Sequence, residues 1–248
     1  MIALISLNIS AQKLHENGKY VDANGVKLFY EVYGEGEPIL MIHGNGGSFA
    51  CFENQVEEFS KHFKVILVDC RGRGNSSYQK EVELTFDLQV EDMYLFLNKL
   101  NIKKANILGW SDGGIIGLLL AIKHPETVIK LVTSGANIFP DGALHQEELE
   151  KGITDLENNN KNHENDLAID LNNLDFKYPN LQYADLNVIK SKTLIIAGDH
   201  DEIKGEHTLK IYESIPDAQL AILPNSSHSA LIENSTLFNE IVLRFLLQ

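Results

Sequence analysis

The stretch Ile107-Leu108-Gly109-Trp110-Ser111-Asp112-Gly113-Gly114-Ile115-Ile116-Gly117 decides the fold of this chain. It starts in a short apolar run, passes through Gly-Trp-Ser-Asp-Gly and continues as an apolar helical pattern. This order predicts a strand, a sharp turn and a helix, with Ser111 at the apex of the turn. We expect glycine at 109 and 113 because a Cβ atom there would collide with the neighbouring strand or helix. The G-x-S-x-G pattern is typical of a nucleophile elbow, which projects a serine hydroxyl over the edge of a sheet.

Strand and helix patterns alternate on both sides of this turn. Before it, buried strands are predicted at 39–42 and 65–68, and Thr85 can cap a helix that runs to about residue 100. The remaining predicted elements are an antiparallel hairpin around Asn24-Gly25, strands at 128–132, 193–197 and 218–223, and a closing helix at about 231–247. The sequence therefore predicts an α/β fold with a mainly parallel central sheet and helices on both faces.

The alternation stops between about 135 and 190, where the chain is acidic and rich in asparagine. A structureless loop of this length is improbable in a compact domain. Modest amphipathic patterns around 144–156 and 167–174 predict an inserted helical cap instead. We expect one domain over 20–248 with this cap at about 135–190, preceded by a separate segment at 1–19.

Residues 1–19 leave two interpretations open. The apolar stretch from Met1 to Gln12 resembles the core of a secretory signal with a cleavage site after Ala11, but it lacks a positively charged leader and Asn8 interrupts it. A remnant of a signal peptide would make the protein exported or periplasmic. An N-terminal tail or extra strand would leave it cytoplasmic, so the compartment stays open.

Composition excludes several classes of function. A chain of 248 residues with a hydrophobic fraction of 44% and a charged fraction of 23% is typical of a globular domain. Its net charge of −14 argues against nucleic acid and anionic membrane surfaces as partners. No apolar run approaches the roughly 20 residues of a membrane-spanning helix. Neither cysteine, Cys51 or Cys70, lies in a metal-ligand spacing, so no metal site is predicted.

A serine nucleophile needs a histidine base that a carboxylate orients. Asp199 and Asp201 both follow the strand at 193–197, and we prefer Asp201 because two more residues carry it off the strand. His228 lies on the loop after the last predicted strand. The chain order serine, aspartate, histidine is the one expected for this architecture, so Ser111, Asp201 and His228 are the predicted catalytic residues.

Other histidines fit the role of base less well. His43 lies beside the glycine-rich turn Gly44-Asn45-Gly46-Gly47, where support of the loop backbone is the better interpretation. His200 and His207 are expected to lie at the periphery of the site.

The backbone N–H groups of Asn45 and Asp112 are the predicted donors to an oxyanion. Gly46, Trp110 and Asp112 are the predicted substrate contacts. The Asp112 carboxylate has two interpretations: it would attract a substrate amine, or it caps the helix that it opens. We prefer the helix cap. Asp69, Arg71 and Arg73 are expected to stabilise their loop electrostatically.

By these motifs the chain, from about Tyr20 to Leu247, resembles the α/β-hydrolase superfamily. Four signatures carry the resemblance: His43-Gly44-Asn45-Gly46, the segment from Asp69 to Ser76, the elbow, and the Asp201/His228 pair. Gly-Trp-Ser-Asp-Gly-Gly followed by Ser134-Gly135-Ala136-Asn137 is similar to the biphenyl-hydrolase-like group, which includes valacyclovir hydrolase. The resemblance implies a cofactor-free serine hydrolase, of the carboxylesterase type, that acts on a small-molecule ester.

Several alternatives remain beside this hydrolase. The same fold and triad occur in ligand receptors or signalling partners with little turnover, and in hydrolases of amide, thioester or carbon–carbon bonds. A Rossmann dehydrogenase is disfavoured because Phe49 occupies the place of the third glycine after Gly44 and Gly46. The acyl and leaving groups, the pathway and the choice between monomer and homodimer stay open.

Overall fold

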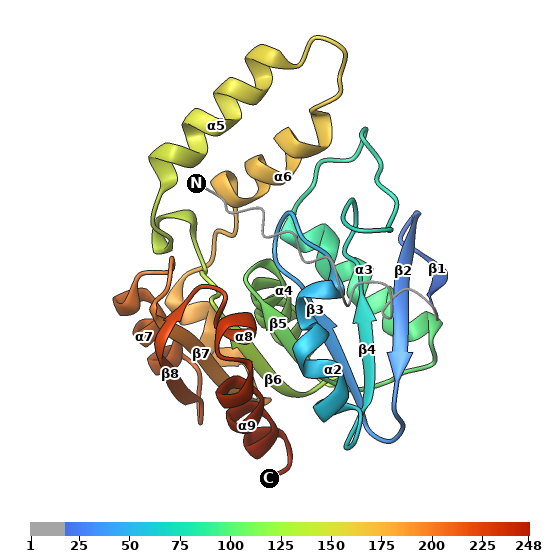
Figure 1. Ribbon diagram of the computed structural model, residues 1–248, viewed down its shortest axis with the longest axis vertical. Helices are drawn as coiled ribbons and strands as arrows, with labels where there is room; N and C mark the ends of the chain where they lie inside the picture. The colour runs from blue at the N-terminus through green and yellow to red at the C-terminus, as the bar shows by residue number, and fades with distance from the viewer. Residues whose placement is uncertain (1–17) are drawn as a thin grey trace.

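The computed structural model describes residues 18–248, which form a mainly parallel sheet of eight strands flanked by helices (Figure 1). The strand order is β1-β2-β4-β3-β5-β6-β7-β8. Strand β2 runs antiparallel to both of its neighbours, β1 and β4, and the other pairs are parallel. Strands β1 and β2 form the predicted hairpin. The strands are β1 (Lys19–Ala23), β2 (Val26–Tyr33), β3 (Pro38–Ile42), β4 (Lys64–Val68), β5 (Ala105–Trp110), β6 (Val128–Ser134), β7 (Lys192–His200) and β8 (Gln219–Ser227). The predicted fold class is confirmed, whereas the prediction for 1–19 falls almost wholly outside the described residues.

Helices cover both faces of the sheet, because successive side chains of a strand point to opposite faces. In β3, Leu40 and Ile42 pack with the residues of α3 and α4, whereas Ile39 and Met41 pack with those of α2 and α9. The first layer holds α3 (Phe86–Lys99), α4 (Asp112–Lys123) and α7 (Gly205–Ser214); the second holds α2 (Glu53–Phe59), α8 (Ala230–Glu233) and α9 (Ser235–Leu246). Thr85 caps α3 as predicted, with its side chain accepting from the Leu88 N–H.

The predicted boundaries of three elements near the C-terminus are wrong. The expected single helix at 231–247 is divided at Asn234, whose backbone is not helical (φ −127°, ψ 45°). The Asn234 side chain donates to Ser226 Oγ and to the Pro224 carbonyl, and such local bonds compete with a continuous helix. Strands β7 and β8 are also longer than predicted, so Asp201 and His228 directly follow their last residues.

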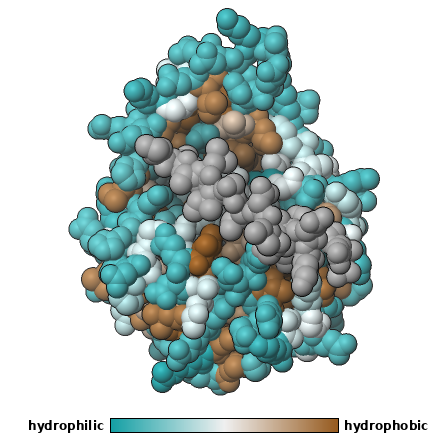
Figure 2. All heavy atoms as spheres, in the orientation of Figure 1, coloured by the Kyte–Doolittle hydropathy of each residue, from teal (hydrophilic) through white to brown (hydrophobic). Residues whose placement is uncertain are grey.

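The segment between β6 and β7 extends away from the sheet as two packed helices, α5 (Gln146–Asn159) and α6 (Asp166–Lys177) (Figure 1). Short 3₁₀ turns, η3 (Pro140–Gly142) and η4 (Tyr183–Val188), lead into and out of it. Figure 2 shows hydrophilic residues over its outer part and hydrophobic residues lower down, toward the sheet. Tyr78 donates to Asp170 and Lys80 pairs with Asp166, so α6 is fastened to the loop after β4. Its role as a cap stays a prediction.

Within residues 18–248, none of the helices combines the length and apolar character that a membrane crossing requires.

Candidate active site

The turn between β5 and α4 holds Ser111 in a strained backbone conformation, with φ 54° and ψ −120°. The Ser111 N–H donates to the Ser134 carbonyl at 2.8 Å, which fixes the turn against β6. A Cβ atom on Gly109 would lie 2.1 Å from the Gly113 carbonyl oxygen, and one on Gly113 would lie 1.8 Å from the Ile42 carbonyl oxygen. The predicted need for both glycines is confirmed, because the helix and strand approach each other too closely for a side chain.

A short hydrogen bond joins Asp201 after β7 to His228 after β8, with 2.7 Å between His228 Nδ1 and Asp201 Oδ1. Asp201 Oδ1 also accepts the Ile203 N–H at 3.0 Å, which orients the carboxylate. Burial works against its charge, but the hydrogen bond and charge of His228 outweigh burial and lower the pKa of Asp201. Burial likewise disfavours protonated His228, yet the hydrogen bond to Asp201 and the surrounding acidic charges raise the pKa of the imidazole.

Two contacts bring this pair to Ser111. The Trp110 indole N–H donates to the His228 carbonyl at 2.8 Å, so the residue before the serine supports the histidine loop. Gly135, next to the residue that holds Ser111, lies against the imidazole, because a Cβ atom there would be 2.7 Å from His228 Cε1. Over the described residues, no hydrogen bond joins Ser111 Oγ to His228. Such bonds are often long in the absence of substrate.

The loop after β3 lies beside the serine, since a Cβ atom on Gly44 would be 2.9 Å from Ser111 Cβ. His43 supports this loop as expected: its Nε2 accepts the Cys70 N–H at 3.0 Å and its Nδ1 lies 2.7 Å from the Gly44 carbonyl. Burial, with a smaller contribution from the charge of Arg73, lowers the pKa of His43 to about 3, so this imidazole is neutral. The Asp112 N–H belongs to the first residue of α4, where backbone donors have no partner within the helix.

The Asp112 carboxyl does not cap its helix, and that interpretation is wrong. Its Oδ2 accepts from Arg73 Nη2 at 2.6 Å, and both side chains are buried. The carboxyl group is also hydrogen-bonded to that of Asp175 on α6. Arg73, expected only to stabilise its own loop, therefore connects that loop to the elbow.

Asp175 is the residue of this site that sequence reasoning missed. It lies on α6, 64 positions after Ser111 (175 − 111), in a stretch whose only pattern is amphipathic. No local spacing in the sequence distinguishes it from the other acidic residues of that segment. Only the docking of α6 brings it to the elbow.

Residues 37–162 of this chain match the family described as alpha/beta hydrolase fold. The chain belongs to this family. The match covers the loop after β3, the elbow and the start of the inserted segment.

Two relatives of this α/β hydrolase share less than 30% of the aligned residues with it. It is 29% identical over 152 residues to the uncharacterized hydrolase YraK of Bacillus subtilis (strain 168), covering 61% of this chain and about half (55%) of that protein. It is 27% identical over 256 residues to serine hydrolase BPHL of Mus musculus, covering 91% of this chain and 85% of that protein. The similarity to BPHL confirms the resemblance that the motifs predicted.

A crystal structure of the enol-lactonase from Burkholderia xenovorans LB400 has the same fold, with a TM-score of 0.79 and 22% identity. The superposition covers 93% of this chain and 100% of that one.

The other residues of the α/β hydrolase that were considered from the sequence lie as follows. His200 is exposed, whereas His207 is buried away from the elbow, where its Nε2 accepts the Ile138 N–H at 3.1 Å. Asp199, the rejected acid, accepts the Ser226 N–H and stabilises the end of β8. Trp110 and Gly46 flank Ser111 and Asn45, and their contact with substrate stays a prediction. In the part of the chain that the structure describes, no group of three or more His, Cys, Asp or Glu side chains could hold a metal ion.

Proposed function

We propose that this α/β hydrolase is a serine hydrolase that cleaves a small carboxylic ester, with Ser111 as nucleophile, His228 as base and Asp201 as the orienting acid. The observation that carries the proposal is the 2.7 Å bond between His228 and Asp201, on a loop that Trp110 ties to the strained serine turn. An activated serine requires this combination of base, orienting carboxylate and exposed apex.

The reaction follows in two halves. Ser111 Oγ attacks the ester carbonyl while His228 Nε2 takes its proton, and the N–H groups of Asn45 and Asp112 stabilise the oxyanion. His228 then gives the proton to the leaving alcohol, and an acyl-enzyme remains on Ser111. A water molecule, deprotonated by His228, attacks the acyl carbon and releases the carboxylic acid and free Ser111.

The surroundings of Asp112 favour a plain acyl ester over an aminoacyl ester. Its carboxyl group already bonds Arg73 and Asp175, so a substrate ammonium would have to compete with a buried guanidinium at 2.6 Å. The same triad serves hydrolysis of lactones, amides and carbon–carbon bonds. Those remain the alternative substrates.

Replacing Ser111 by alanine tests the proposal. Turnover of p-nitrophenyl acetate should fall by at least about 10³-fold, because nothing else can form the acyl-enzyme. Ser214→Ala on α7, a serine whose hydroxyl bonds only the Lys210 carbonyl, is the control and should keep wild-type rates. The same assay with an aminoacyl ester tests the substrate class, and a preference of about tenfold or more for that ester would contradict it.

Retention of wild-type turnover by Ser111→Ala would remove the proposed nucleophile. A single burst of p-nitrophenol from the wild-type protein, with no further turnover, would instead support a ligand receptor of the same fold.

A further inference from the structure

The Asn45 side chain joins the loop after β3, which carries one of the two proposed oxyanion donors, to α6. Its Nδ2 donates to the Leu171 carbonyl at 2.8 Å and to Asp175 Oδ2 at 2.7 Å. Its Oδ1 accepts the Gly46 N–H at 2.8 Å and Arg73 Nη2 at 3.1 Å. One amide therefore connects its own loop, the loop after β4 and the inserted helices.

Polar contacts, rather than steric ones, hold the backbone between Asn45 and Gly46. Gly46 has φ 64°, and a Cβ atom on it would meet no atom within 4 Å. Steric contact with neighbours does not hold this turn, and glycine itself is free to adopt many conformations. The peptide unit that carries the Asn45 N–H is therefore held from two sides. His43 Nδ1 lies 2.7 Å from the Gly44 carbonyl of that unit, and the hydrogen bonds of the Asn45 side chain hold it on the side of α6.

Asp175 is held in turn by the elbow. Its carboxyl group is hydrogen-bonded to that of Asp112, which pairs with Arg73. Two carboxyl groups can bond each other only if they share a proton, because two buried negative charges repel. The charged groups that face the pair are Arg73, from the loop after β4, and His228, from the loop after β8. Burial raises the pKa of both carboxyl groups, which favours a proton shared between them.

We propose that Asp175 is a positioning residue for the reaction: from α6 it fixes the Asn45 side chain, so that docking of this helix completes the oxyanion hole. The proposal rests on Ser111 as the nucleophile. Asp175 acts through Asn45 and Asp112, which supply the two N–H groups on either side of the oxyanion, and its charge also faces His228. Loss of one oxyanion donor costs about 10²–10³-fold in kcat, so a displaced donor should cost a large part of that.

Two substitutions of Asp175 separate positioning from simple packing. Asp175→Ala removes the acceptor of the Asn45 amide, and kcat should fall about 10- to 100-fold while KM changes less than about threefold. Asp175→Asn should restore kcat to within about threefold of wild type. Its amide oxygen can accept from Asn45, and its NH₂ group can donate to the Asp112 carboxylate in place of the shared proton.

Asp170→Asn is the matched control. Asp170 also lies on α6, where it accepts a hydrogen bond from Tyr78 of the loop after β4 rather than from Asn45. This variant should keep kcat within about threefold of wild type, because only the anchoring of α6 is weakened. Equal losses in Asp170→Asn and Asp175→Ala would overturn the proposal. A loss in Asp175→Asn as large as that in Asp175→Ala would do the same.

Infrared spectroscopy can detect the proton shared by the two carboxyl groups without any measurement of turnover. The carbonyl band of a buried protonated carboxyl group should be present at neutral pH in wild type and in Ser111→Ala, and absent in Asp175→Asn. Active wild-type enzyme without that band would show that Asp112 and Asp175 share no proton, and would overturn the part of the proposal in which Asp175 acts through Asp112. Absence of Ser111-dependent turnover in wild type would overturn the proposed function first, and with it the role of Asn45.

Discussion

At the scale of the residue, burial and the neighbouring acidic groups have opposite effects on the charge of His228. Burial disfavours the imidazolium, whereas the hydrogen bond to Asp201 and the charges of Asp201, Glu202 and Asp175 favour it. The balance raises the pKa above the ordinary value of 6.5. Because a general base must be neutral, the proposed reaction should slow as the pH falls through this raised value.

Replacing Asp201 by asparagine tests this balance. The acidic limb of kcat/KM should lie above pH 6.5 in wild type and move to lower pH in Asp201→Asn, since the main charge that favours the imidazolium is lost. The rate should also fall by about 10³–10⁴-fold, because the imidazole is no longer held in its productive tautomer. The measurement is kcat/KM for p-nitrophenyl acetate against pH.

Glu202→Gln is the control for charge alone. Glu202 raises the pKa of His228 without a hydrogen bond to it, so its loss should shift the limb slightly and leave the plateau rate unchanged. A wild-type limb below pH 6.5, or one that Asp201→Asn leaves in place, would contradict the assignment.

At the scale of the element, the elbow depends on how closely α4 approaches the sheet. Residues 112–121 of this helix are all buried, between the strands and α3. The first turn of the helix lies so near β3 and β5 that only glycine fits at 109 and 113. The strained Ser111 backbone is therefore held by packing on both sides.

Alanine substitutions in two helices measure this constraint. Gly113→Ala should destabilise the fold by about 3 kcal/mol or more, because its Cβ would lie 1.8 Å from a backbone oxygen. Gly152→Ala on α5 should stabilise it by about 0.5–1 kcal/mol, since the new Cβ meets nothing within 4 Å and alanine favours the helix. Urea unfolding gives both free energies. Equal stability of the two variants would refute the packing argument.

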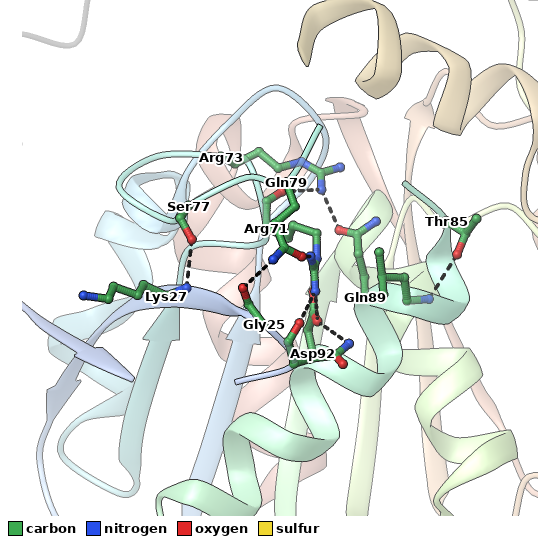
Figure 3. Close-up of polar contacts among 11 residues, drawn as sticks. Gly25, Lys27, Arg71, Arg73, Ser77, Gln79, Thr85, Gln89 and Asp92 are labelled. Atoms are coloured by element: carbon green, nitrogen blue, oxygen red, sulfur yellow. Dashed lines mark hydrogen bonds and ion pairs between the residues drawn. The ribbon is translucent and has the colours of Figure 1, made fainter. Parts of the chain in front are cut away.

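At the scale of the whole molecule, a buried ion pair ties the antiparallel hairpin to the parallel part of the sheet (Figure 3). Arg71 donates through Nε and Nη2 to both oxygens of Asp92 on α3, at 2.8 and 2.6 Å. Arg71 Nη2 also donates to the Asn24 carbonyl in the hairpin turn, at 2.9 Å. Three segments distant in sequence therefore meet at one guanidinium.

Breaking this pair from one side should be costly. Arg71→Ala leaves the Asp92 carboxylate buried without its partner, and the free energy of unfolding should fall by about 3–5 kcal/mol. Replacing both residues, as in Arg71→Met with Asp92→Leu, should recover at least about 2 kcal/mol of that loss, because no unpaired charge remains. A double-mutant cycle by urea unfolding checks this. Additive single effects would show that the two charges are not coupled.

The amino-acid sequence was sufficient to predict the strand, turn and helix at Ser111 and the alternation of strands and helices that makes the sheet mainly parallel. The chain order also predicted that Asp201 and His228, the proposed acid and base, follow two neighbouring strands. These features depend on periodicity, on glycine at defined positions and on chain order, which are local properties. The carboxyl ends of neighbouring parallel strands share one edge, so Asp201 and His228 could be expected together before any coordinates were known.

The partners of Asp112 could be recognised only from the way distant segments pack together. The helix-cap interpretation considered only the residues next to Asp112 in sequence. Arg73 and Asp175, which contact its carboxyl group, come from segments far away in the chain. Asp175 had no signal in the sequence because its place depends on how α6 docks. The break at Asn234 likewise follows from bonds to β8 that periodicity does not encode. Local patterns therefore placed Ser111 at its turn, whereas the long-range docking of α6 and of the loop after β4 determines which groups surround it.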